Sequence, residues 1–273
     1  MSKRGQFKLP TSIKYVMFGH SHAECAYNDS VISNFKNLSS SGESYFYTYF
    51  KIKQIIEHNP HLTLILVEFS NNQIMSDMDD WVWDDKHLSN GYSKWGTFMG
   101  LSAHKLLMRN NPESILFNMA YSQKLNLYRI LNNDFNFVDN MGGYRYLPSK
   151  NSNLNVTKRM DSIRKHRDIK KVSHVNLIYL KKIVKLCEQS NIKIAFVRSP
   201  QHNNNIARDN ECVFLTVKNQ RFKGVSFIDF NNLELSDNMF KDLGHLNYLG
   251  ANIVSKKLDS ILKSRIPNND IIF

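Results

Sequence analysis

Three polar side chains of this 273-residue chain have the types and the spacing of a serine nucleophile and its base. Ser21 lies in the segment Gly-His-Ser-His-Ala-Glu at 19–24, directly after an apolar run. At a tight turn between a strand and a helix a serine hydroxyl is exposed, and a nearby base can activate it for attack on a carbonyl carbon. Near the other end of the chain, Asp242 and His245 lie three residues apart. Such a carboxylate can hold the imidazole in one tautomer and support its protonated form, so the three residues indicate acyl transfer.

The same residues also fit ordinary structural roles. Serine and aspartate are common helix caps, so Ser21 and Asp242 could each begin a helix, with His245 on the surface. Neither motif identifies a catalytic site by itself. Their joint occurrence at two ends of a repeating strand–helix pattern favours the catalytic interpretation.

Two further positions supply groups that could stabilise an oxyanion. Gly42 lets the backbone approach a bound anion closely, and Asn71 or Asn72 offers a side-chain amide. Glycine and asparagine are also common turn residues, so these positions carry weight only together with the nucleophile and the base.

Alternating strand-like and helix-like segments are expected to position these residues. Five runs predict strands, at 13–18, 37–41, 62–69, 192–197 and 225–230. Apolar residues at helical spacing predict helices over 45–58, 175–188 and 248–262. This alternation indicates βαβ units, and hence a mainly parallel sheet between two layers of helices. Ligands of such sheets bind at the carboxyl ends of the strands, where the nucleophile, the glycine and the asparagines all lie.

The stretch 77–171 interrupts the alternation and is expected to be a largely helical insertion between the third and fourth strands. It contains all three tryptophans, Trp81, Trp83 and Trp95. The insertion is too closely interleaved with the sheet segments to form a domain of its own. We therefore expect residues 1–273 to form a single domain.

The order of the motifs resembles that of the SGNH, or GDSL-like, hydrolase superfamily over residues 13–262, apart from the insertion. That family has a serine in a Gly-x-Ser turn after the first strand, a glycine after the second, an asparagine after the third, and Asp-x-x-His near the C-terminus. The resemblance implies a flavodoxin-like, three-layer α/β/α fold with a mainly parallel five-stranded sheet. It implies Ser21 as nucleophile, His245 as base, Asp242 as the orienting carboxylate, and an oxyanion hole made by Ser21, Gly42 and Asn71 or Asn72.

The chain departs from the family pattern at position 20, where His20 replaces the usual aspartate, and around Asn71, which lacks the usual Gly-x-Asn-Asp. The pair His20-x-His22 also resembles the metal-binding Gly-His-Thr-His turn of metallophosphoesterases. Those enzymes take further ligands from earlier strands, but residues 1–18 contain no Asp, Glu, His or Asn. We therefore expect neither a metal ion nor a cofactor.

The activity that the resemblance implies is cleavage of acyl esters, in the first place acetyl esters on a carbohydrate, through a Ser21 acyl-enzyme. The alternatives are a glycan O-acetyltransferase that uses the same residues, and a non-catalytic relative that binds a glycan or a protein. The expected partner is an acylated small molecule or a glycan. Flat aromatic faces suit sugar rings, so Trp81 and Trp83 are candidate substrate contacts, together with His20 and His22; core packing is the alternative for the tryptophans.

Composition bounds the remaining possibilities. Hydrophobic residues make up 42% of the chain, which excludes a disordered or fibrous protein, and three cysteines exclude a disulfide framework. The cysteine usage and the lack of a signal peptide or an apolar run near ~18 residues predict a cytoplasmic protein without a membrane span. The net charge is +12, with its densest basic stretch at 158–171. That stretch is expected to be a solvated helix or an anion-binding groove, and without a nucleic-acid-binding motif we do not expect nucleic acid as a partner.

Overall fold

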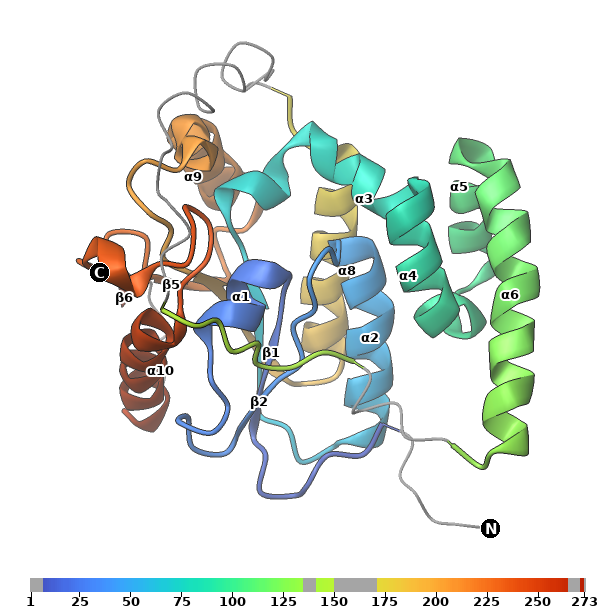
Figure 1. Ribbon diagram of the computed structural model, residues 1–273, viewed down its shortest axis with the longest axis horizontal. Helices are drawn as coiled ribbons and strands as arrows, with labels where there is room; N and C mark the ends of the chain where they lie inside the picture. Colours follow the sequence, from blue (N-terminus) through green and yellow to red (C-terminus); the bar gives the residue numbers. More distant parts are fainter. Residues whose placement is uncertain (1–6, 135–140, 150–170, 265–270, 273) are drawn as a thin grey trace.

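The computed structural model describes residues 7–134, 141–149, 171–264 and 271–272. They contain one parallel sheet (Figure 1), and its strand order is β2-β1-β3-β4-β5-β6. The strands are Tyr15–Phe18 (β1), Phe35–Asn37 (β2), Leu64–Glu68 (β3), Lys193–Arg198 (β4), Ser226–Asp229 (β5) and Ile271–Ile272 (β6). The first five confirm the predicted fold class, and β6 adds a short edge strand that the sequence did not predict. The order reverses between β1 and β3, and this switch point is where flavodoxin-like sheets bind ligands.

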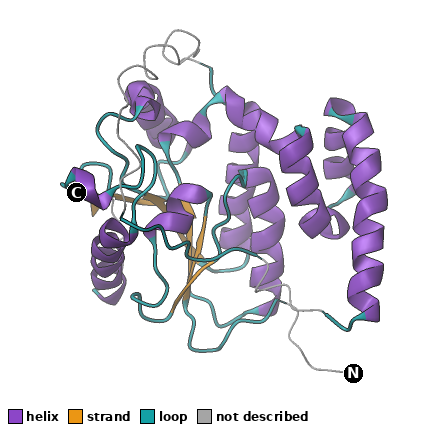
Figure 2. Ribbon diagram, viewed as in Figure 1, coloured by secondary structure: helices purple, strands orange, loops and turns teal. Residues whose placement is uncertain are grey.

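Helices cover both faces of the sheet (Figures 1 and 2). One face packs against α2 (Tyr45–His58), α8 (His174–Gln189) and α9 (Glu211–Arg221). The other packs against α1 (Ser21–Ala26) and α10 (Tyr248–Lys263). In β3, Ile65 and Val67 enter the first core and Leu64 and Leu66 the second. A strand covered on both sides must be apolar at every position, which explains its unbroken apolar sequence.

The predicted helix at 45–58 has the observed bounds of α2, and the predictions for α8 and α10 are correct to within a residue at each end. The second strand was placed wrongly: it ends at Asn37, where the predicted strand began. The Asn37 side chain donates to the carbonyl oxygens of Ala23 and Tyr27 and accepts from the amide of Ser39. These bonds turn the chain out of the sheet, so the following serines form a loop.

The described residues between β3 and α8 are largely helical, as predicted. They contain α3 (Asp80–Trp83), α4 (Asp85–Trp95), α5 (Leu101–Asn110) and α6 (Pro112–Leu131), with short 3-10 turns at Asn71–Ile74, Ser76–Asp79 and Gly96–Phe98. Two more 3-10 turns, Ile206–Asn210 and Asp237–Met239, follow β4 and β5. A bridge between Met75 and Val172 joins the two ends of the insertion. The basic stretch 158–171 lies outside the described residues except for Lys171.

Among the described residues, every helix is too short or too polar to cross a membrane.

Candidate active site

The structure brings Ser21, His245 and Asp242 together at the carboxyl end of the sheet. Ser21 is the first residue of α1, directly beyond β1, and His245 lies in the loop before α10. His245 Nε2 lies 2.8 Å from Ser21 Oγ, and His245 Nδ1 lies 2.8 and 2.9 Å from the two carboxylate oxygens of Asp242. In this chain of contacts the imidazole can donate from Nδ1 to the carboxylate and accept from the hydroxyl at Nε2. That is the arrangement a serine nucleophile needs from its base.

The loop that carries the base is held by its own backbone. Asp242 Oδ1 accepts from the amides of Gly244 at 2.8 Å and His245 at 2.9 Å, and a bridge between Phe240 and Leu246 closes the loop. Partial burial raises the pKa of the Asp242 carboxyl, but the hydrogen bonds from His245 and the two amides outweigh this effect and hold the pKa below its usual value. The carboxylate is therefore ionised wherever it must support an imidazolium.

Glu68, the last residue of β3, holds the serine turn from behind. Its Oε2 accepts from the amides of His20 at 3.0 Å and Ala23 at 3.2 Å, on either side of Ser21. Gly19 makes this approach possible, because a Cβ at that position would lie 2.6 Å from Glu68 Oε2. Sequence reasoning missed Glu68. The available signal was a single acidic residue at the end of an otherwise apolar strand.

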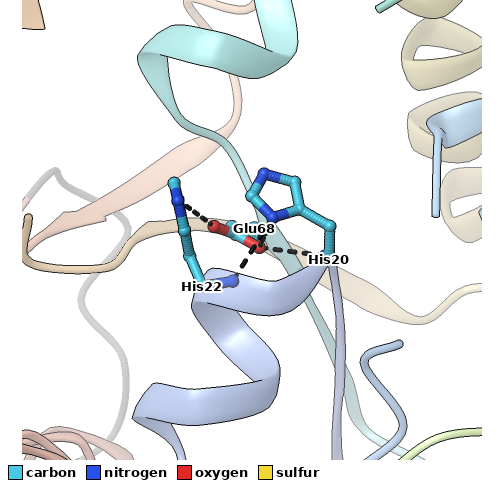
Figure 3. Close-up of side chains that lie close together, drawn as sticks. All are labelled: His20, His22 and Glu68. Carbon is cyan, nitrogen blue, oxygen red and sulfur yellow. Dashed lines mark hydrogen bonds and ion pairs between the residues drawn. The ribbon is translucent and has the colours of Figure 1, made fainter. Parts of the chain in front are cut away.

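The two histidines beside Ser21 face Glu68, as Figure 3 shows. His20 is fully buried and His22 is 8% exposed. This corrects the expectation that His20 contacts substrate, since its side chain does not reach the surface. Burial lowers the pKa of His20 to about 4, so its imidazole is neutral at physiological pH. Burial raises the pKa of Glu68, but the neighbouring histidines and the Ala23 amide outweigh it and hold the carboxylate in its ionised form.

Of the two candidate asparagines, the structure brings Asn72 to the serine turn. Asn72 Nδ2 lies 3.2 Å from His20 Nε2, and its carbonyl oxygen accepts from Ser70 Oγ at 2.8 Å. Asn71 is buried, and both ends of its amide are already paired: it donates to Asn210 and Glu211 and accepts from Arg198. Asn71 therefore belongs to a structural network and has no donor left for an oxyanion.

Gly42 lies in the loop that follows β2, next to the serine turn. The amide of Ser40 donates to the carbonyl oxygen of Gly19 at 3.0 Å, which ties the two loops together. Gly42 has a φ of +75°, a conformation that favours glycine. A Cβ there would lie 3.4 Å from His87 Nε2, and His87 pairs with Asp84 at 2.8 Å. Gly42 thus borders a small polar pocket between this loop and α4, which His87 and Lys94 also line.

The three tryptophans do not form a joint platform. Trp81 lies at the site: its ring meets His20 edge-on at 5.9 Å and stacks on His87 at 4.9 Å. Trp83 packs against the core, and Trp95 is 2% exposed within it. Core packing therefore explains Trp83 and Trp95, and Trp81 alone keeps the position of a substrate contact.

An exposed aromatic pair that sequence reasoning missed lies beside the base. Tyr248, three residues after His245, stacks on Tyr146 with ring centroids 5.2 Å apart. The two side chains are 37% and 60% exposed. The strap 141–149 that carries Tyr146 crosses the site side of α1: the amide of Arg145 donates to the carbonyl oxygen of Glu24, and the amide of Tyr248 to that of Leu147. These two tyrosines come together only in the folded chain, so no local sequence motif predicts the pair.

The fold and the site define a three-layer α/β protein with a Ser-His-Asp constellation at the switch point of its sheet. The model of an uncharacterised protein family matches residues 120–267, more than half of the chain, and the chain belongs to this family. The matched region includes Asp242 and His245 and begins after Ser21. No curated protein matches the chain.

Proposed function

We propose that the protein is an SGNH-like serine esterase that cleaves acyl esters, in the first place acetyl esters on a carbohydrate, through a Ser21 acyl-enzyme. The observation that carries the proposal is the unbroken contact from Ser21 Oγ through the His245 imidazole to the Asp242 carboxylate. The order of Ser21, Gly42, Asn72 and Asp-x-x-His along the chain, which resembles that superfamily, supports it.

The proposed reaction has two halves that the same residues perform. His245 Nε2 takes the hydroxyl proton as Ser21 Oγ bonds to the ester carbonyl carbon, and Asp242 stabilises the imidazolium. The tetrahedral intermediate then expels the alcohol, which takes the proton from His245 and leaves the acyl group on Ser21. Water repeats the sequence with His245 as base and releases the acid. The amides of Ser21 and Gly42 and the Asn72 side chain are the proposed oxyanion donors, and one such donor contributes about 2.7–4 kcal/mol of barrier reduction.

The exposed tyrosine pair supports a carbohydrate substrate. Tyr248, three residues after the base, and Tyr146, which stacks on it, place aromatic rings on the surface. Tyrosine combines an apolar ring with a hydroxyl that can bind a sugar hydroxyl. A sugar hydroxyl held there could replace water in the second half-reaction. The glycan O-acetyltransferase therefore remains the second candidate.

The same proposal includes a cytoplasmic location. The three cysteines are free thiols, which agrees with a reducing compartment.

The test combines labelling and turnover. An organophosphonate that reacts with activated serines should modify Ser21 in the wild type, and mass spectrometry locates the adduct whatever the natural acyl donor is. Hydrolysis of p-nitrophenyl acetate should be lost in Ser21→Ala and His245→Ala. Ser93→Ala and His104→Ala, on α4 and α5, serve as matched controls and should keep both properties. Absence of label on Ser21, or turnover that survives Ser21→Ala, would overturn the proposal.

A further inference from the structure

We propose that His20, His22 and Glu68 form a binding site for one zinc-like divalent metal ion, directly behind the serine turn. Two imidazoles and one carboxylate are a ligand set that zinc accepts in proteins. All three residues are buried, and one potential ligand atom from each lies within 4.8 Å of the others. The histidines come from the start of α1 and the glutamate from the end of β3, so the ion would join two elements of the fold (Figure 3).

The distances within the cluster suit coordination better than hydrogen bonding. His22 Nδ1 lies 3.4 Å from Glu68 Oε1, and His20 Nδ1 lies 3.7 Å from Glu68 Oε2. Both exceed the 2.7–3.2 Å of ordinary hydrogen bonds. Two atoms bonded to one tetrahedral zinc ion at 2.0–2.2 Å lie about 3.3–3.6 Å apart. Each imidazole thus lies near the separation expected for two ligands of one ion, but from a different carboxylate oxygen, so the side chains would have to shift to bring one oxygen close to both.

One carboxylate oxygen of Glu68 has a free lone pair. Oε2 accepts two backbone amides, but the fully buried Oε1 has no hydrogen-bond partner among the described residues. Within that part of the chain, the two histidines are the only ion-pair partners of Glu68. A fully buried carboxylate oxygen without a hydrogen-bond partner is unfavourable. A bound metal ion would occupy the free lone pair of Oε1.

Each imidazole has a polar neighbour besides Glu68. His20 Nε2 lies 3.2 Å from Asn72 Nδ2; with an ion on Nδ1, Nε2 would carry the ring proton, and the Asn72 amide would have to turn its oxygen toward it to act as the acceptor that metal-binding imidazoles usually have. His22 Nδ1 lies 2.9 Å from Gln201 Nε2, and His20 Nδ1 accepts from the His22 amide at 3.3 Å. The ion would have to displace these two neutral donors. His22, 8% exposed, offers the entry path.

The site differs from the metallophosphoesterase arrangement considered above. There the further ligands precede the Gly-His-x-His turn, whereas here the third ligand, Glu68, comes from a later strand. The inference does not depend on the serine reaction, because ion binding can be measured without any substrate. Its consequence for the fold is a second clamp on the residues that flank Ser21.

The test measures Zn²⁺ binding directly. The purified protein is stripped with a chelator, dialysed against Zn²⁺ and assayed for metal by mass spectrometry, and its affinity is measured by competition with a chromophoric chelator. We expect one Zn²⁺ per chain in the wild type and an affinity at least about 100-fold lower in His22→Gln and Glu68→Gln. His104→Gln, which removes a half-buried histidine of α5 that contacts Tyr92, should bind as the wild type does.

Two further measurements keep the test decisive if a variant folds poorly. Zn²⁺ should raise the unfolding temperature of the wild type, because only the folded state holds the three ligands together. Co²⁺ in the same site should give the visible absorption of tetrahedral coordination. Failure of the wild type to retain a stoichiometric ion would overturn the proposal, and so would binding that both variants keep undiminished.

Discussion

His245 Nε2 lies 2.8 Å from Ser21 Oγ although 224 residues separate the two in the chain. The two residues meet beyond the carboxyl end of β1. Ser21 directly follows this strand, and His245 precedes α10, which packs against α1 on the same face of the sheet. The reactivity that we propose depends on this pair being held from both sides. Asp242 holds the imidazole, and Glu68 holds the backbone around the serine.

Replacement of Asp242 with asparagine should remove most of the activity without removing the fold. The amide cannot stabilise the imidazolium and favours the wrong tautomer of His245, so kcat for p-nitrophenyl acetate should fall on the order of 10³–10⁴-fold. The matched control is Asp237→Asn, since Asp237 also pairs with a histidine, His202, at 3.1 Å. If both variants lost the same activity, the loss would not be specific to the carboxylate that contacts His245, and the role assigned to Asp242 would be wrong.

The stability that Asp242 contributes should depend on pH in a defined direction. Its folded-state pKa lies below the usual value, so the unfolded chain binds the proton more readily. The contribution is therefore complete above the ordinary aspartate pKa of about 3.9 and is lost as the pH falls through the folded value. In urea unfolding, the difference in free energy between the wild type and Asp242→Asn should be constant from neutral pH to about pH 5 and shrink below that. A difference that grows on acidification would contradict the assigned pKa direction.

Neighbouring asparagines should give opposite phenotypes. Asn72→Ala should lower kcat by about 10²–10³-fold with little change in stability, as expected for loss of one oxyanion donor. Asn71→Ala removes one hydrogen bond from each of the buried residues Arg198 and Asn210 and should cost about 1–3 kcal/mol of unfolding free energy. Each variant is the control for the other, by kinetics and chemical unfolding. The oxyanion assignment would be wrong if Asn72→Ala kept the wild-type kcat.

Loss of an exposed tyrosine should affect carbohydrate esters selectively. Tyr146→Ala and Tyr248→Ala should raise KM for an acetylated oligosaccharide about 2–10-fold, because each removes one ring of the stacked pair, and should leave p-nitrophenyl acetate hydrolysis unchanged. Tyr121→Ala, which removes an exposed tyrosine from α6, is the control. Equal effects on both substrates would indicate a role in folding of the loop.

A methyl group at position 19 should not be tolerated. In Gly19→Ala the new Cβ would lie 2.6 Å from Glu68 Cβ and 2.9 Å from Ala23 Cβ, so the serine turn would have to move. Overpacking of this kind costs about 1–3 kcal/mol, and the movement should also lower kcat. Gly224→Ala is the matched control, since its Cβ would meet nothing within 4 Å. Chemical unfolding and the esterase assay together check this prediction, which fails if Gly19→Ala matches Gly224→Ala.

The sequence by itself determined the fold class, the helices α2, α8 and α10 and the largely helical insertion, because apolar spacing is a local property of the chain, but it did not predict α9. It also singled out Ser21, Asp242 and His245, whose motifs each occupy a few consecutive residues. The position of strand β2 was predicted wrongly because the strand ends where the Asn37 side chain bonds to the carbonyl oxygens of Ala23 and Tyr27, and these contacts form only in the folded chain.

Only the tertiary structure decided which neighbours these residues have. Consecutive residues in a 3-10 turn point in different directions, so Asn72 reaches the serine turn while Asn71 enters a buried network. In the sequence, Glu68 is a single polar position in an apolar strand. It accepts from the amides around Ser21, and can serve as the proposed metal ligand, only because β3 lies beside β1. Contacts between residues far apart in sequence leave no local pattern, and these contacts shape the candidate site.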